Sequence, residues 1–375
     1  MIYLDCAATS LQKPKKVHEA VQHAMRTMAS PGRGAYAPAM KAAETAYLCR
    51  MELAQLFHVS DAERIVFTCN ATHGLNIAIH DLVSKGDKVV VSGYEHNSVL
   101  RPLYQLGADV NAVKTDLFDN CACLDQFENT LRGAKVVVFT AMSNVFGYIL
   151  PIREIADLCS EKGIPLIVDA SQLAGCGDLD FERLGAAYMA MPGHKGLLGP
   201  QGTGVLICGR VPKPLMSGGT GSESRNVRMP DFLPDCAEAG THNISGIAGL
   251  LEGVRFIRRI GVSEIATHER RCLERFVREI EDMDGIETFY DRNQSKHGAV
   301  LSLRHETIDS QMLTETLGNF GVAVRGGLHC APLAHETVGT AKTGTVRFSF
   351  SPFVSEREVI KAARRLKFCV NKLKT

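Results

Sequence analysis

A single lysine, Lys195, follows a histidine in the glycine-rich stretch 191–204. Apolar segments flank this stretch at 186–190 and 205–208, which predicts a loop between two strands. Glycines let the backbone approach a ligand closely, and a lysine held over an apolar surface can lose its proton near neutral pH. Such an amine can act as a Schiff-base nucleophile. The alternative is an ordinary solvated lysine on a surface turn.

Asp169 is the acidic residue that would complement this lysine. It follows the apolar run 165–168, and a carboxylate at the end of a buried strand is costly unless it is paired. A cationic ring nitrogen would be a suitable partner. Pyridoxal phosphate needs both groups, because an amine binds its aldehyde and an acid keeps its pyridine nitrogen protonated.

Glycines at 199–204 and 217–222 raise a nucleotide-binding alternative. A dinucleotide fingerprint must lie between a strand and a helix. The first loop leads into an apolar, strand-like run, and the second leads into the polar, proline-containing stretch 223–234. Neither loop therefore predicts a nucleotide site.

The elements that must position these residues are apolar runs rich in valine and isoleucine, at 64–68, 88–91, 134–140 and 165–168. Helical patterns at 14–28, 39–57 and 244–260 accompany them. This alternation predicts an α/β fold with a mostly parallel sheet buried on both faces. Ligands of such sheets bind outside the carboxyl ends of the strands, so the residues after each run are candidates for a site.

Three of these strand ends carry suitable side chains. Ala71 and Thr72 follow the run 64–68, where a hydroxyl and free N–H groups at a helix start suit a phosphate; alternatively, Thr72 only caps the helix. His96 follows the run 88–91 and could stack on a flat ring, although a lone loop histidine is more often a surface residue. Asn144 follows the run 134–140 and could bond a ring substituent.

Composition limits the class of protein. The 375 residues are 45% hydrophobic, which suggests two domains. The 42 Lys and Arg residues balance 41 Asp and Glu residues, so no basic field would attract nucleic acid or an anionic membrane. The chain starts without a signal-peptide pattern and has no apolar run of about 18 residues, so we expect a soluble, cytoplasmic protein.

The twelve cysteines are scattered, and we expect most to be buried thiols. Cys121 and Cys123 form the one tight pair. Because a zinc site would need a second pair or nearby histidines, no metal is predicted.

The order of these motifs resembles the class V aminotransferase family of fold-type I pyridoxal-phosphate enzymes, and more narrowly its cysteine desulfurase and selenocysteine lyase branch. The residues that carry the resemblance are Thr72, His96, Asn144, 169–172 and 193–195. The likeness continues from 3–9 through 238–243 into the last third of the chain.

The resemblance implies roles for individual residues. Lys195 would bind the cofactor aldehyde, Asp169 the pyridine nitrogen and Gln172 the ring hydroxyl. His96 would stack on the ring and move protons, and Asn144 would lie beside cofactor and substrate. The phosphate would be held by Ala71, Thr72 and His194, and by Thr220 from a neighbouring subunit, which implies a homodimer.

Three positions depart from the family pattern. Pro192 stands where many desulfurases have a serine that binds phosphate, and Cys6 stands where the opening motif usually has asparagine. Leu328 replaces a second histidine.

A large cofactor domain is expected at 13–255, and a smaller α/β domain at 1–12 and 256–375.

Cys330 lies beside His329 in a glycine-rich loop, a setting that favours a reactive thiolate over a buried inert thiol. It matches the desulfurase nucleophile, and the following loop 331–343 resembles the short loop of the group II enzymes. Arg347 matches the arginine that clamps the substrate carboxylate, and Arg325 is a second expected substrate contact.

The implied reaction converts L-cysteine to L-alanine and passes sulfur, as a persulfide on Cys330, to an acceptor protein. Selenocysteine lyase is one alternative, with L-selenocysteine as substrate. A pyridoxal-phosphate aminotransferase or simple C–S lyase would use the same cofactor residues without Cys330. A non-catalytic sulfur-carrier scaffold is a further alternative.

Overall fold

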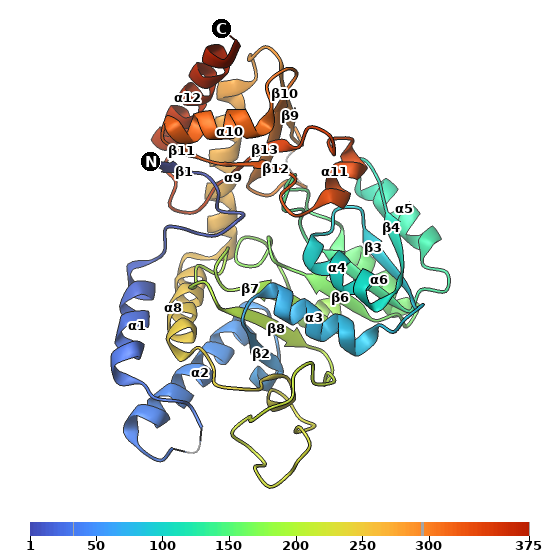
Figure 1. Cartoon of the computed structure of the whole chain (residues 1–375), viewed down its shortest axis with the longest axis vertical. Helices are drawn as coiled ribbons and strands as arrows, with labels where there is room; N and C mark the ends of the chain where they lie inside the picture. Colours follow the sequence, from blue (N-terminus) through green and yellow to red (C-terminus); the bar gives the residue numbers. More distant parts are fainter. Residues whose placement is uncertain (33, 294–295, 375) are drawn as a thin grey trace.

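A computed structural model describes residues 1–32, 34–293 and 296–374. Its centre is a seven-stranded sheet with the order β2-β8-β7-β6-β5-β3-β4 (Figure 1). The strands are β2 (Ile65–Thr68), β3 (Lys88–Ser92), β4 (Asp109–Val113), β5 (Val136–Thr140), β6 (Leu166–Asp169), β7 (Tyr188–Pro192) and β8 (Gly204–Cys208). Only β8 runs antiparallel to its neighbours within this sheet, so the predicted mixed, mostly parallel sheet is confirmed.

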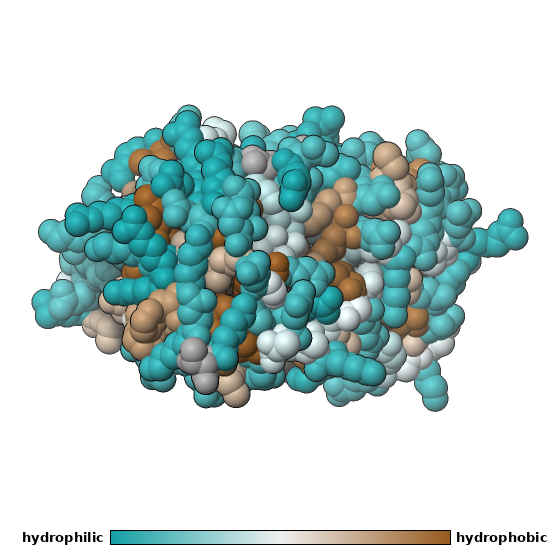
Figure 2. Space-filling model, turned by 90° about the horizontal axis from the view of Figure 1, so that it is seen from above, coloured by the Kyte–Doolittle hydropathy of each residue, from teal (hydrophilic) through white to brown (hydrophobic). Residues whose placement is uncertain are grey.

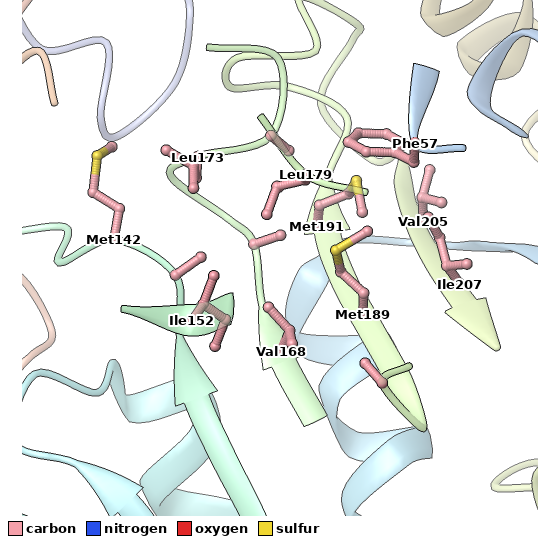
Figure 3. Close-up of a cluster of buried hydrophobic side chains, with 14 of the residues drawn as sticks. Phe57, Met142, Ile152, Val168, Leu173, Leu179, Met189, Met191, Val205 and Ile207 are labelled. Carbon is pink, nitrogen blue, oxygen red and sulfur yellow. The ribbon is translucent and has the colours of Figure 1, made fainter. Parts of the chain in front are cut away.

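Both faces of this sheet are buried because its central strands are apolar at successive positions. On one face, Val168, Met189 and Val205 pack with Phe57 (Figure 3). The alternate residues, such as Ile167 and Leu206, belong to a separate cluster on the other face. The edge strand β4 was not predicted, because its sequence DVNAV interrupts the apolar residues with polar ones.

Helices cover the two faces. They are α1 (Lys15–Thr27), α2 (Ala37–Leu56), α3 (Ala71–Leu82), α4 (Asn97–Leu106), α5 (Asn120–Thr130), α6 (Ile152–Glu161), α7 (Phe181–Leu184) and α8 (Ile244–Ile260). Leu53 of α2 packs into the same cluster as Phe57, whereas Leu75 of α3 and Leu103 of α4 pack into the cluster on the opposite face. The three predicted helices at 14–28, 39–57 and 244–260 are therefore confirmed as α1, α2 and α8.

A second, smaller sheet has its own hydrophobic core. Its antiparallel order is β12-β13-β10-β9, from β9 (Ile286–Phe289), β10 (Val300–His305), β12 (Arg325–Gly327) and β13 (Thr345–Ser349). The accompanying helices are α9 (Val262–Ile280), α10 (Ser310–Asn319), α11 (Pro332–Val338) and α12 (Glu356–Lys374). The chain's first strand, β1 (Ile2–Tyr3), joins this part by pairing with β11 (Val322–Ala323). The domain limits of 13–255 and 1–12 with 256–375 stay a prediction.

The surface seen from the side of the smaller sheet is largely hydrophilic, with separate apolar patches (Figure 2). Within the part of the chain that is described, no helix is both long and apolar enough to cross a membrane.

Candidate active site

The carboxyl ends of β3, β5, β6 and β7 surround a pocket of about 240 Å³. It brings together eight of the residues that the sequence predicted for a cofactor site. They are Ala71, Thr72, His96, Asn144, Asp169, Gln172, His194 and Lys195. Thr220 is not among its lining residues; its hydroxyl hydrogen bonds that of Ser222 in the long connection between β8 and α8.

Lys195 lies on the predicted loop between β7 and β8. Glycine is needed next to it, because a Cβ on Gly196 would lie 2.2 Å from the carbonyl oxygen of Ala174. Burial lowers the pKa of Lys195 to about 8, although the nearby Asp169 carboxylate acts in the opposite direction. The lysine is therefore partly in its neutral, nucleophilic form near physiological pH.

Asp169 is the last residue of β6 and is 3% exposed. Its Oδ1 accepts a hydrogen bond from the backbone N–H of Ser171 at 2.9 Å. The carboxylate lines the pocket together with Lys195, so a cationic group of a ligand could pair with it there. A buried carboxylate requires such a partner.

His96 has a structural task besides lining the pocket. It caps α4, and its Nδ1 accepts a hydrogen bond from the backbone N–H of Ser98 at 3.0 Å. A neutral ring with an accepting Nδ1 carries its proton on Nε2. Burial, followed by the charge of Lys195, lowers the pKa of His96 to about 4, so the ring is neutral at physiological pH.

One end of the pocket is rich in hydrogen-bond donors. The first N–H groups of α3, at Ala71 and Thr72, have no intrahelical partner. Asn70, and not Thr72, is the side-chain cap of α3, since its Oδ1 accepts from the N–H of His73 at 2.9 Å. The Thr72 hydroxyl instead hydrogen bonds the Ser98 hydroxyl at 2.8 Å. The N-terminus of α3 and two hydroxyls thus lie where an anion would bind.

A wider pocket of about 580 Å³ adjoins this site and contains the predicted substrate residues. Lys195, His96 and Asn144 line both pockets, and Arg325, Cys330 and Arg347 line the wider one. The structure therefore brings residues of both sheets, far apart in sequence, into one site.

The Cys330 side chain is exposed. His329 and Cys330 have φ angles of 51° and 57°, a left-handed conformation that non-glycine residues rarely adopt. The carbonyl of His329 accepts a hydrogen bond from Nδ2 of Asn144, and that of Cys330 accepts one from the N–H of Asn97, each at 2.8 Å. These bonds fix the thiol-bearing loop to residues at the wall of the smaller pocket.

Arg347 is 2% exposed and is held by two partners. Its Nη1 donates to the Asn144 carbonyl and its Nη2 donates to Oδ1 of Asp5, both at 2.9 Å. Nε has no hydrogen-bond partner among the described residues. The half-exposed Arg325 donates to Oδ2 of the same Asp5 at 2.9 Å.

The sequence reasoning missed Ser98, which lines the smaller pocket, and two residues that contact residues of the site, Asp5 and Glu95. The rule that identified Asp169 applies equally to Asp5, which follows the short apolar run 2–4. Glu95 is fully buried, and its Oε1 accepts from the Ser92 hydroxyl at 2.5 Å and from the Thr140 N–H at 2.7 Å. Burial raises the pKa of Glu95 to about 8. No pattern in the sequence distinguishes Glu95 from an exposed glutamate.

Comparison with known proteins agrees with this geometry. Residues 2–361 match the family model for class V aminotransferases. A probable cysteine desulfurase of Pyrococcus abyssi is 32% identical, over 96% of this chain and 92% of that protein. One from Methanothermobacter thermautotrophicus is 33% identical over the same shares. The apo structure of a cysteine desulfurase from Thermococcus onnurineus superimposes with a TM-score of 0.90 and 30% identity, covering 99% of this chain and 95% of that one. The chain belongs to the class V aminotransferase family.

Proposed function

We propose that this protein is a pyridoxal-phosphate-dependent cysteine desulfurase. The observation that carries the proposal is the joining of two pockets: Lys195 and Asp169 line one, and an exposed Cys330 and buried Arg347 line the other. The Lys195 residue shared by both pockets lets one substrate molecule reach the cofactor residues and the thiol together.

The residues of the smaller pocket fit pyridoxal phosphate. Asp169 offers a carboxylate to the pyridinium nitrogen, and Lys195 offers an amine to the aldehyde. Thr72, Ser98 and the start of α3 offer donors to the phosphate; Ser98 thereby provides a hydroxyl that Pro192 lacks. When bound, the cofactor supplies an electron sink for negative charge at the substrate α-carbon.

Lys195 is the base that the geometry favours for the α-proton. Its Nζ is partly neutral near physiological pH because burial lowers its pKa to about 8. His96 is less suited, since its Nδ1 is occupied by the Ser98 N–H and its Nε2 already carries the proton. We therefore assign His96 to ring stacking and hydrogen-bond donation, and proton removal to Lys195.

Arg347 is placed to bind the substrate carboxylate. Asp5 and Asn144 hold its two terminal nitrogens, which fixes the plane of the guanidinium. Arg325 lines the same pocket and adds positive charge for the same group.

Cys330 would accept the sulfur. Its thiolate attacks the sulfur of cysteine, an S–S bond forms, and the C–S bond breaks. The electron pair of that bond and a proton remain on the carbon skeleton, which leaves as L-alanine. The persulfide on Cys330 then passes its outer sulfur to an acceptor protein. We further propose a homodimer in which Thr220 contacts the phosphate site of the partner.

Product analysis tests this function. The holoenzyme is incubated separately with L-cysteine and L-selenocysteine, and alanine and keto acids are measured. A desulfurase gives alanine from cysteine. Alanine from selenocysteine alone would assign a selenocysteine lyase, and a keto acid would assign an aminotransferase or simple C–S lyase. The absence of any product would assign a non-catalytic relative.

A further inference from the structure

A third cavity lined by Lys195 lies where the two parts of the molecule meet. Its volume is about 50 Å³, which has room for roughly three to five waters at 10–15 Å³ each. Lys195, Gln172 and Met142 line both this cavity and the cofactor pocket. In Figure 3, Met142 lies beyond the ends of the strands, apart from Val205 and Ile207.

Glu269 of α9 forms part of the wall of this cavity. It is 7% exposed and lies in the buried stripe of α9 with Ile265, Cys272 and Phe276. Burial is the only effect on the pKa of its carboxyl group, to which no hydrogen bond or charge of another described residue contributes. A carboxyl group is costly to bury without a partner, so water in the adjoining cavity is the partner that the geometry offers.

The cysteines near Glu269 do not exchange protons at neutral pH. Burial raises the pKa of the Cys6 thiol to about 12 and that of Cys272 to about 11. It also raises the pKa of Cys176 well above the usual value. Burial also lowers the pKa of Lys13 to about 8, but Lys13 does not line the cavity; its Nζ hydrogen bonds Ser10, which does.

Lys195 and Glu269 are therefore the groups lining the cavity that titrate closest to neutrality, among the residues described. Burial lowers the pKa of Lys195 to about 8 and raises that of Glu269 to about 8. Two groups with matched proton affinities can exchange a proton at little cost in free energy.

We propose that Glu269 exchanges a proton with Lys195 through the water in this cavity. The proposal rests on the proposed role of Lys195 as base. After Nζ has taken the α-proton, a water accepts a proton from the ammonium and another proton passes to Glu269 in those molecules whose carboxyl group is ionised. Lys195 becomes neutral and Glu269 becomes a carboxylic acid, and the reverse transfer returns the proton. No oxidation or reduction is involved.

Cys6, which lines the same cavity, gives Glu269 a different neighbour from the one expected in resembling enzymes. Resembling enzymes usually have asparagine at this position, and an amide could donate a hydrogen bond to a neighbouring carboxylate. The half-buried Cys6 thiol is a weak donor and hydrogen bonds Ser351, which leaves Glu269 to water.

The test compares Glu269→Gln, a neutral isostere, with Glu264→Gln, an exposed position on the same helix. Infrared difference spectra of the cofactor-free proteins are recorded from pH 6 to 10. We expect a protonated-carboxyl band that disappears as the pH rises through about 8 and is missing only from Glu269→Gln. If wild type has no such band at pH 6–7, the proposal is wrong.

Steady-state kinetics of the holoenzymes with cysteine provide the second readout. We expect kcat of Glu269→Gln to fall roughly tenfold with little change in KM, and the slope of kcat near pH 8 to be lost. Glu264→Gln should match wild type. Wild-type kcat and pH profile in Glu269→Gln would overturn the relay.

Two further comparisons cover a variant that does not fold and a failure of the proposed function. If Glu269→Gln does not fold, Cys6→Asn replaces it, and the added amide should move the infrared transition to lower pH. An unchanged transition and pH profile in Cys6→Asn would contradict the proposal. If wild type makes no alanine from cysteine, the proposed function fails, and the infrared band still reports separately on Glu269.

Discussion

Oδ1 of Asp5 accepts a hydrogen bond from Nη2 of Arg347 at 2.9 Å, across 342 residues of sequence. The pairing of β1 with β11 and a bridge between Asp5 and Ser349 place the start of the chain beside β13. The first residues therefore position the guanidinium that we propose binds the substrate carboxylate.

Asp5→Asn should destabilise the protein. Arg347 is buried, and loss of its counter-charge leaves an uncompensated cation, which costs roughly 3 kcal/mol in the free energy of unfolding. Urea denaturation of the cofactor-free protein, followed by circular dichroism, measures this change. Asp125→Asn, at an exposed position on α5, is the control and should be neutral. Equal stability of the two variants would show that Asp5 does not stabilise Arg347.

Arg347→Lys should weaken substrate binding. A lysine cannot bond Asp5 and Asn144 and also present a planar group to a carboxylate. Loss of one charged hydrogen bond, worth about 1.5–3 kcal/mol, predicts a roughly 10- to 100-fold lower kcat/KM, mainly through a higher KM. Initial rates of alanine formation over a range of cysteine concentrations measure it, with the exposed Arg183→Lys as control. An unchanged KM would assign the carboxylate to another residue.

Lys195 should react as an unusually acidic ammonium group. In the cofactor-free protein, labelling by a small amine-directed reagent should rise with a midpoint near pH 8, roughly two units below an ordinary lysine. Peptide mass spectrometry compares Lys195 with the exposed Lys85.

Asp169→Asn provides a second test of the Lys195 labelling midpoint. The Asp169 carboxylate raises the pKa of Lys195 against the effect of burial, so its removal should move the midpoint to lower pH. A midpoint near pH 10 in wild type, or a rise in Asp169→Asn, would contradict the arrangement.

The strands, and the residues that meet at their carboxyl ends, were predictable because their signals are local. Uninterrupted valine and isoleucine runs identify buried strands, and the rule about carboxyl ends then selects Thr72, His96 and Asp169. Contacts between distant segments carried no such signal. The Asp5 and Arg347 pair, and the cavity beside Glu269, depend on how β1 and α9 pack against the larger sheet. The spacing of Glu269 places it in the apolar stripe of α9, but a glutamate is ordinarily exposed, so the residue type gives no sign of a buried carboxyl group.

The Cys330 assignment is tested most directly by one turnover without an acceptor. Holoenzyme is mixed with cysteine, alanine is counted per chain, and cysteine peptides are examined for a gain of one sulfur atom. We predict one alanine and one added sulfur on Cys330, and none of either in Cys330→Ala with its cofactor still bound. The exposed Cys121→Ala should behave as wild type. Alanine formation at the wild-type rate in Cys330→Ala would contradict the account.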